Sequence, residues 1–268
     1  MRAARLPRTR LTPLSAMAVL AKGCPEMSFM VLADNPSPKP APRRALSYGS
    51  PIGLFQIAAA AFCGLALFAA AVPVAKADAP VKIVALGDSL TAGLGLPERE
   101  GFAPRLQAAL AARGVAAEIA NAGVSGDTAT DGLARLDWSV PDGTDAVIVE
   151  LGANDMLRGI NLQTTRAALD RILRRLKERH IVVLLCGMRA APNLGADYGE
   201  AFERIYPELA AKYGALLYPF FLDGVAGERS LNQHDGLHPT AAGVETIVTG
   251  ILPQVEELVA RARRLHPS

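Results

Sequence analysis

Five short apolar runs that alternate with helical patterns constrain the fold of this 268-residue chain more than any other feature. Each run is four to six residues long, and most are rich in Val, Ile and Leu. Continuous apolar runs of this length are typical of parallel strands that are buried on both faces of a sheet. The runs span residues 81–86, 116–120, 146–151, 181–186 and 215–218.

The segments between and after these runs have helical spacing. Phe102, Leu106 and Leu110 share one helical face, and Gly114 is a typical stop signal. The other segments with this spacing are 169–176, 202–213 and the stretch that follows Thr240. The alternation predicts an α/β fold: a doubly wound parallel sheet of about five strands with helices on both faces. In such sheets, active sites lie beyond the carboxyl ends of the strands.

The first 77 residues differ from the rest and are predicted to be a leader. Residues 1–51 lack an apolar period and contain many Arg and Pro residues, which favours disorder. An apolar run, 57–74, then precedes the small-residue site Ala75-Lys76-Ala77. A basic region, an apolar stretch and such a site predict a secretory signal peptide cleaved after Ala77. Residues 78–268 would then form one domain in the periplasm or the medium.

An uncleaved inner-membrane anchor is the alternative, because the apolar run is at the lower length limit for crossing a bilayer. Arg43-Arg44 resembles a twin-arginine signal, but the following residues fit that pattern poorly, so ordinary Sec export is favoured. Met27 and Met30 leave the true start open.

Charge and cysteine content exclude several classes of function. The net charge is +2 and the basic residues are interspersed with acidic ones, so a nucleic-acid partner is not expected. Two of the three cysteines, Cys24 and Cys63, lie in the predicted leader. Cys186 ends an apolar run and is interpreted as a buried strand residue rather than a nucleophile. No cluster of His, Cys and carboxylate residues has metal-ligand spacing.

The segment Gly87-Asp-Ser-Leu-Thr-Ala-Gly93 follows the first apolar run and contains the candidate nucleophile, Ser89. A serine at a sharp strand-to-helix turn presents its hydroxyl above the sheet, and its amide lies at a helix N-terminus. Ser89 as a simple helix cap is the alternative. The segment is not a G-x-S-x-G elbow, because Thr91 takes the place of the second glycine. Gly93-Leu-Gly95 matches neither a dinucleotide fingerprint nor a P-loop.

Two further loops supply candidate oxyanion donors. Residues 121–128 follow the second run and include Gly126, and Gly152-Ala-Asn154-Asp follows the third. Each loop alone reads as structural. Together, the backbone amides of Ser89 and Gly126 and the side-chain amide of Asn154 would offer three donors to an oxyanion.

The segment Gln233-His-Asp-Gly-Leu-His-Pro239 contains the candidate base. A nucleophilic serine needs a base, and that base needs an acceptor that holds its tautomer. His238 and Asp235 are three residues apart and can form this pair locally. His234 is the competing base, whereas His180 and His266 read as loop or core histidines.

These blocks, in this order, resemble the SGNH (GDSL) hydrolases, and in particular the bacterial thioesterase I/protease I/lysophospholipase and arylesterase branch. The resemblance also includes Gly132-Leu-Ala-Arg-Leu136 and Glu150-Leu-Gly-Ala-Asn-Asp155, and it covers most of the chain after Val81. It implies a flavodoxin-like SGNH hydrolase fold and no cofactor. The site residues carried over by position are Ser89, Asp235 and His238 as catalytic triad and Ser89, Gly126 and Asn154 as oxyanion hole.

The resemblance implies an exported serine esterase or thioesterase that acts on small aryl or acyl esters, acyl-thioesters or lysophospholipids. The membrane would be contacted only through the signal segment or a lipid-like substrate. A carbohydrate or peptidoglycan O-deacetylase with the same triad is the alternative, and an inactive binding module is a third hypothesis. The loop 189–198 and the segment 220–229 depart from the family pattern, which leaves substrate choice open.

Overall fold

The computed structural model describes residues 79–266. The predicted leader, 1–77, with its apolar run 57–74, lies outside the described residues. Within the described residues, no helix combines the length and the apolar character needed to cross a membrane.

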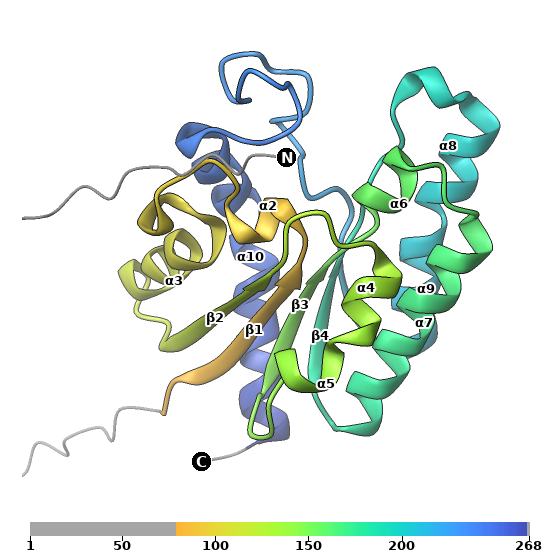
Figure 1. The fold of residues 1–268 in the computed structure, drawn as a ribbon. Helices are drawn as coiled ribbons and strands as arrows, with labels where there is room; N and C mark the ends of the chain where they lie inside the picture. Colours follow the sequence, from red (N-terminus) through yellow and green to blue (C-terminus); the bar gives the residue numbers. More distant parts are fainter. Residues whose placement is uncertain (1–78, 267–268) are drawn as a thin grey trace, which may run out of the picture. The chain divides into compact units, whose positions relative to one another are not determined.

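The described residues form an α/β fold around one five-stranded sheet with the strand order β2-β1-β3-β4-β5, in which every pair is parallel (Figure 1). This order is that of flavodoxin-like sheets, so the predicted fold class is confirmed. The strands are β1 (Val81–Gly87), β2 (Ala117–Gly123), β3 (Ala146–Glu150), β4 (Val182–Cys186) and β5 (Leu216–Tyr218).

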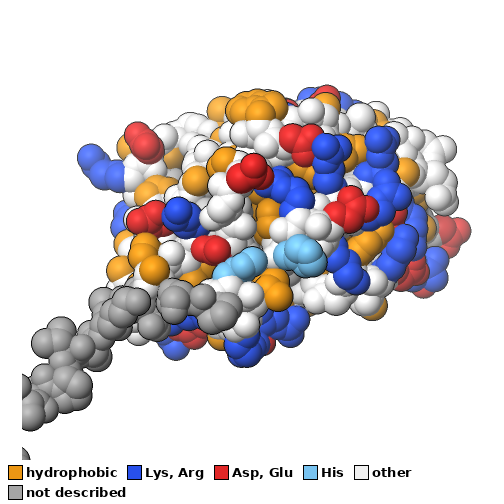
Figure 2. All heavy atoms as spheres, turned by 90° about the horizontal axis from the view of Figure 1, so that it is seen from below, with side chains coloured by type: hydrophobic (Ala, Val, Ile, Leu, Met, Phe, Trp, Pro, Cys, Tyr) orange, Lys and Arg blue, Asp and Glu red, His pale blue; other side chains and the backbone are white. Residues whose placement is uncertain are grey.

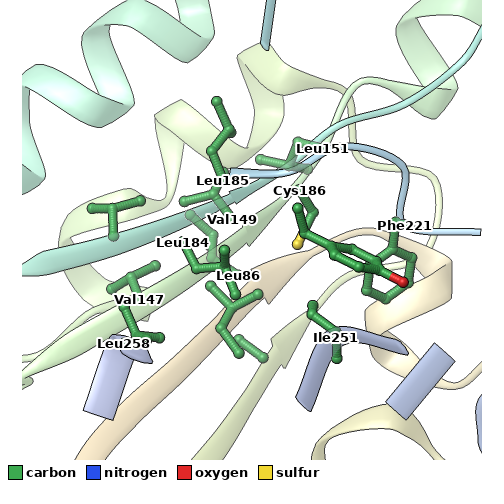
Figure 3. Close-up of a cluster of buried hydrophobic side chains, with 14 of the residues drawn as sticks. Leu86, Val147, Val149, Leu151, Leu184, Leu185, Cys186, Phe221, Ile251 and Leu258 are labelled. Carbon is green, nitrogen blue, oxygen red and sulfur yellow. The ribbon is translucent and has the colours of Figure 1, made fainter. Parts of the chain in front are cut away.

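The three central strands are buried because helices cover both faces of the sheet. Successive side chains of a strand point to opposite faces, and neighbours such as Leu184 and Leu185 are both fully buried (Figure 3). Burial on both faces was expected for every strand, but it is wrong for β2. That strand lies at the edge of the sheet, and its residues Glu118 and Ala120 are exposed.

Helices on the two faces contact different parts of the sheet (Figure 1). One face is covered by α3 (Phe102–Ala112) and α10 (Ala241–Leu265), which also contact each other. The other face is covered by α7 (Leu162–Glu178) and α9 (Ile205–Tyr213), with α4 (Ala129–Ala134) packed on α7. The shorter helical segments are α2 (Ser89–Ala92), η2 (Glu98–Glu100), α5 (Leu136–Ser139), α6 (Ala153–Leu157), η3 (Pro192–Leu194) and α8 (Ala196–Glu203).

The expected single helix over 202–213 is two helices, α8 and α9, separated at Arg204. Phe202, Ile205 and Leu209 keep their apolar spacing across this break and are all buried. The apolar spacing therefore predicted the buried face correctly, but it did not predict that the helix is broken at Arg204.

The amino ends of the strands form the end of the domain away from Ser89. Here His266 Nε2 lies 3.1 Å from the carbonyl oxygen of His180. Figure 2 shows this end, where histidine side chains lie among Lys and Arg side chains interspersed with Asp and Glu. His180 and His266 are therefore remote from the loops at the carboxyl ends.

Candidate active site

Ser89 lies at the turn between β1 and α2, and its residue exposure is 9 %. Asp88 is the N-cap of α2, and its Oδ1 accepts a hydrogen bond of 3.0 Å from the backbone N–H of Leu90. Gly93 ends this short helix in the left-handed conformation, at φ 78°. Capping by Asp88 frees the side chain of Ser89 from the capping role that was considered for it.

The structure brings Ser89, His238 and Asp235 together. His238 Nε2 lies 2.9 Å from Ser89 Oγ, and His238 Nδ1 lies 2.6 Å from Asp235 Oδ2. With the proton on Nδ1, the ring donates to Asp235 and its Nε2 can accept the hydroxyl proton of Ser89. The backbone N–H groups of His238 and Leu237, together with the His238 ring, donate to Asp235 and hold the pKa of its carboxyl below its usual range.

The loop that carries His238 is fixed by hydrogen bonds to neighbouring backbone. Gln233 Nε2 donates to the carbonyl oxygens of Leu94 and Pro239, at 2.8 and 2.9 Å. The buried Asn232 donates to the carbonyl oxygens of Val225 and Glu228. His234, by contrast, is exposed and is not among the residues that line the cleft described below.

Asn154 and Gly126 lie at the carboxyl ends of β3 and β2. Asn154 Nδ2 donates to Asp88 Oδ2 at 3.0 Å, which leaves its second amide proton free to face the cleft. Gly126 has φ 90°, and its carbonyl oxygen accepts a hydrogen bond of 2.6 Å from Arg158, the residue that ends α6. Asn154 lies in the same helix, so Arg158 connects the two loops.

A buried ion pair that the sequence did not reveal supports the turn before Ser89. Arg135 Nε lies 2.6 Å from Asp127 Oδ2, and both residues are buried. The same guanidinium donates to Ser139 Oγ and to the carbonyl oxygen of Gly87, each at 2.9 Å. The hydrogen bond from Arg135 thus fixes the backbone of Gly87, the residue before Asp88.

Two buried acids, Asp88 and Glu150, lie behind Ser89, and the sequence analysis assigned a role to neither. Burial raises the pKa of Asp88 to about 6, against the lowering effect of the hydrogen bonds from Leu90 and Asn154. Burial and the nearby charge of Asp88 raise the pKa of Glu150 well above its ordinary value. Glu150 Oε2 accepts hydrogen bonds from Thr91 Oγ1 at 2.7 Å and from the backbone N–H of Asp88 at 3.3 Å.

Ser89, Asn154 and His238 line a largely apolar cleft of about 380 Å³. Arg189, at its wall, stacks on Phe220 with 4.8 Å between the guanidinium carbon and the ring centroid. The apolar residues that line the cleft include Leu90, Met156, Leu157, Met188, Pro192, Leu222 and Leu237. Cys186 is fully buried and does not line it. Within residues 79–266, no group of three or more His, Cys, Asp or Glu residues is placed to hold a metal ion.

The GDSL-like lipase/acylhydrolase family matches residues 85–245. The chain belongs to this family. That stretch begins inside β1, ends inside α10, and contains all five residues of the candidate triad and oxyanion hole.

The matches to individual relatives include most of each relative's length. Esterase TesA of Pseudomonas aeruginosa is 37% identical over 178 residues, which is 66% of this chain and 89% of that protein. Thioesterase 1/protease 1/lysophospholipase L1 of Escherichia coli strain K12 is 35% identical, over 69% of this chain and 88% of that protein. The crystal structure of AlinE4, an SGNH-hydrolase family esterase, is 48% identical with a TM-score of 0.57, and covers 66% of this chain and 96% of that one. The chain is accordingly a carboxylic ester hydrolase of the SGNH type.

Proposed function

We propose that this chain hydrolyses small esters and thioesters by two-step acyl transfer, with Ser89 as nucleophile, His238 as base and Asp235 as the group that orients the base. The observation that carries the proposal is the continuous set of contacts from Asp235 Oδ2 through the His238 ring to Ser89 Oγ, at 2.6 and 2.9 Å. Both distances are within the range expected for a nucleophile and its base.

In the first step, His238 Nε2 takes the hydroxyl proton while Ser89 Oγ attacks the carbonyl carbon. The oxygen of the tetrahedral intermediate would accept hydrogen bonds from the amides of Ser89 and Gly126 and from Asn154 Nδ2. His238 then gives its proton to the leaving alcohol or thiol. Water, activated by the same ring, attacks the acyl-enzyme and releases the acid.

The proposed substrates are aryl and acyl esters, acyl-thioesters and lysophospholipids. The apolar cleft beside Ser89 supports an apolar acyl or aryl group, since such a group would be desolvated there. The names of the relatives from P. aeruginosa and E. coli support esters, thioesters and lysophospholipids among these substrates.

We expect Ser89→Ala to abolish hydrolysis of p-nitrophenyl esters and acyl-thioesters, by roughly a millionfold in kcat if it behaves as other triad serines do. The fold should persist, because the serine hydroxyl contributes no core packing. A fluorophosphonate probe should label the wild type and not the variant. Full activity in the Ser89→Ala variant would overturn the proposal. If the folded wild-type protein is not labelled by the probe, a binding module would be favoured instead. Release of acetate from acetylated sugars, with slow turnover of longer p-nitrophenyl esters, would instead favour an O-deacetylase.

The proposed location is the periplasm or the medium, reached through cleavage after Ala77. The support is the order of basic, apolar and small-residue segments in the sequence. An inner-membrane anchor remains the competing proposal, and fractionation with N-terminal sequencing separates the two.

A further inference from the structure

Glu150 is a fully buried carboxyl group that the proposed mechanism does not use. It ends β3, directly opposite Gly87 in the parallel register, and its exposure is 0 %. Its Oε2 accepts the hydrogen bonds from Thr91 and Asp88, whereas its Oε1 has no hydrogen-bond partner within the described residues. The acid lies directly behind the turn that carries Ser89.

Close packing leaves Glu150 little freedom to move. A Cβ atom added at Gly87 would lie 2.6 Å from Glu150 Oε2 and 2.0 Å from Thr91 Oγ1. Unbonded atoms do not approach this closely, so a larger residue at position 87 would displace the side chains of Glu150 and Thr91 from their observed places. The place of the Glu150 carboxyl is therefore set by the backbone of β1 and by α2.

The surroundings of Glu150 favour its neutral form. The titratable and charged groups that face the two acids are Cys186, Tyr206, His238 and Arg135. Arg135 donates to Asp127, Ser139 and the carbonyl of Gly87, and no ion pair between it and Glu150 is found in the described part of the chain. A buried carboxylate without a cation and with one unpartnered oxygen would be very unfavourable.

Asp88, by contrast, has donors for both of its oxygens. Leu90 N–H donates to Oδ1 and Asn154 Nδ2 donates to Oδ2. These donors stabilise a negative charge on Asp88, and that charge raises the pKa of Glu150 further. The surroundings of the pair therefore favour a proton on Glu150 and a negative charge on Asp88.

We propose that Glu150 is a positioning residue: as a neutral acid it fixes Asp88, which in turn caps α2 beneath Ser89 and aims the amide of Asn154. The inference rests on the proposed function, since it assigns Asn154 to the oxyanion. Glu150 does not line the cleft and would act through its hydrogen bonds to Asp88 and Thr91.

Two substitutions separate a neutral acid from a charged one. Glu150→Gln keeps a neutral oxygen that accepts from Thr91 Oγ1 and from the backbone N–H of Asp88, so kcat at pH 7 should stay close to the wild-type value. Glu150→Leu removes both capabilities at similar volume. It should lower kcat by about tenfold or more, part of the hundred- to thousandfold that an oxyanion donor is worth, with little change in KM.

The pH profile gives a readout that a purely structural role would not change. In the wild type, kcat should fall at alkaline pH, when Glu150 loses its proton and two buried carboxylates repel each other. Glu150→Gln has no such proton, so its plateau should extend to higher pH. Cys186→Ala is the matched control, because Cys186 is the buried register partner of Glu150 on β4. This control should retain the alkaline fall.

An infrared spectrum tests the protonation state without using activity. The wild type and the Ser89→Ala variant should both show the C=O stretch of a buried protonated carboxyl at pH 7, and Glu150→Gln should lack it. The proposal is overturned if Glu150→Gln is as impaired as Glu150→Leu, if its alkaline fall persists, or if the carboxyl band is absent. If Ser89→Ala stays active while the band is present, the proposed function fails and the neutral state of Glu150 stands.

Discussion

At the residue scale, the contact between Asp235 and the His238 ring leads to a specific prediction about tautomers. Asp235→Asn places an amide N–H against His238 Nδ1, which favours the tautomer with the proton on Nε2. That nitrogen then cannot accept the Ser89 proton, and kcat should fall by about ten-thousandfold, as it does for the equivalent change in a serine protease. Steady-state hydrolysis of an aryl ester measures the effect.

His234→Ala is the control for this prediction. His234 is exposed and lies one residue from Asp235, but it does not line the cleft, so the variant should keep most of its activity. An inactive His234→Ala together with an active His238→Ala would mean that the base is misassigned.

Glu150 makes a second residue-scale prediction, on stability. Its pKa is raised in the folded state, whereas in the unfolded chain a Glu titrates at about 4.3. Between these two values the folded protein binds more protons, so this group's contribution to the free energy of unfolding is full below pH 4 and declines as pH rises. Glu150→Gln lacks this decline. The difference in Tm, variant minus wild type, should therefore become more positive from pH 5 to 8, and parallel Tm curves would contradict the raised pKa.

The residues of the candidate site divide into those that sequence can suggest and those that it hides. Asp235 and His238 are three residues apart, so their pairing can be proposed from spacing alone. Ser89 lies 149 residues from His238, but both were expected at the carboxyl edge of the sheet. Arg135 and Glu150 belong to blocks that resemble the family, but spacing assigned them no role, because their importance comes from burial. A charged residue at the end of an apolar run, as Glu150 is, was the available clue.

At the scale of elements, the strands were predicted closely because parallel strands bury continuous apolar runs. The errors came from position in the sheet and from the break between α8 and α9, and the short helix α4 was not predicted at all. Glu118, a charged residue inside the run 116–120, was the available sign that β2 is exposed at the edge of the sheet. The start of α4 depends on a capping box between Thr128 and Asp131, which apolar spacing does not detect.

The packing of α2 against the end of β2 makes a prediction at this scale. A Cβ atom at Gly123 would lie 2.3 Å from the backbone nitrogen of Ala92, so Gly123→Ala must displace α2 or the end of β2. Overpacking of this kind costs about 1–3 kcal/mol, and a shifted α2 moves Ser89 away from His238. Both Tm and kcat should fall.

Gly199→Ala is the matched control. Gly199 lies inside α8, and the nearest atom to its added Cβ is the Cβ of Ala190 at 3.9 Å, an ordinary contact. Alanine is favoured over glycine in a helix by about 0.8–1 kcal/mol, so Tm should rise or stay constant while kcat is unchanged. An unchanged Gly123→Ala variant would mean that the α2–β2 contact does not position the serine.

At the scale of the whole domain, the candidate active site lies at the carboxyl ends of the strands, and a surface of mixed charge lies at their amino ends. The carboxyl ends of β1 and β3 and the loop before α10 bring Ser89, Asn154 and His238 to one cleft, and Gly126 follows the carboxyl end of β2. The amino ends carry interspersed charges (Figure 2). A parallel sheet produces this division, because every strand ends at the same edge and the loops there converge.

The extent of the described core leads to the last prediction. The first strand begins at Val81, whose N–H donates to the carbonyl oxygen of Ala116, and the core of the described domain extends to Ala262. Each residue of the proposed site lies between these limits. A protein that begins at Asp78 should therefore fold and hydrolyse esters with the kcat/KM of the enzyme recovered after expression of the full chain. If the proposed export and cleavage take place, N-terminal sequencing of that recovered enzyme should return Asp78. An insoluble or inactive truncated protein would mean that the first 77 residues contribute to the fold, and a membrane-bound product with an intact N-terminus would identify the apolar run as an anchor.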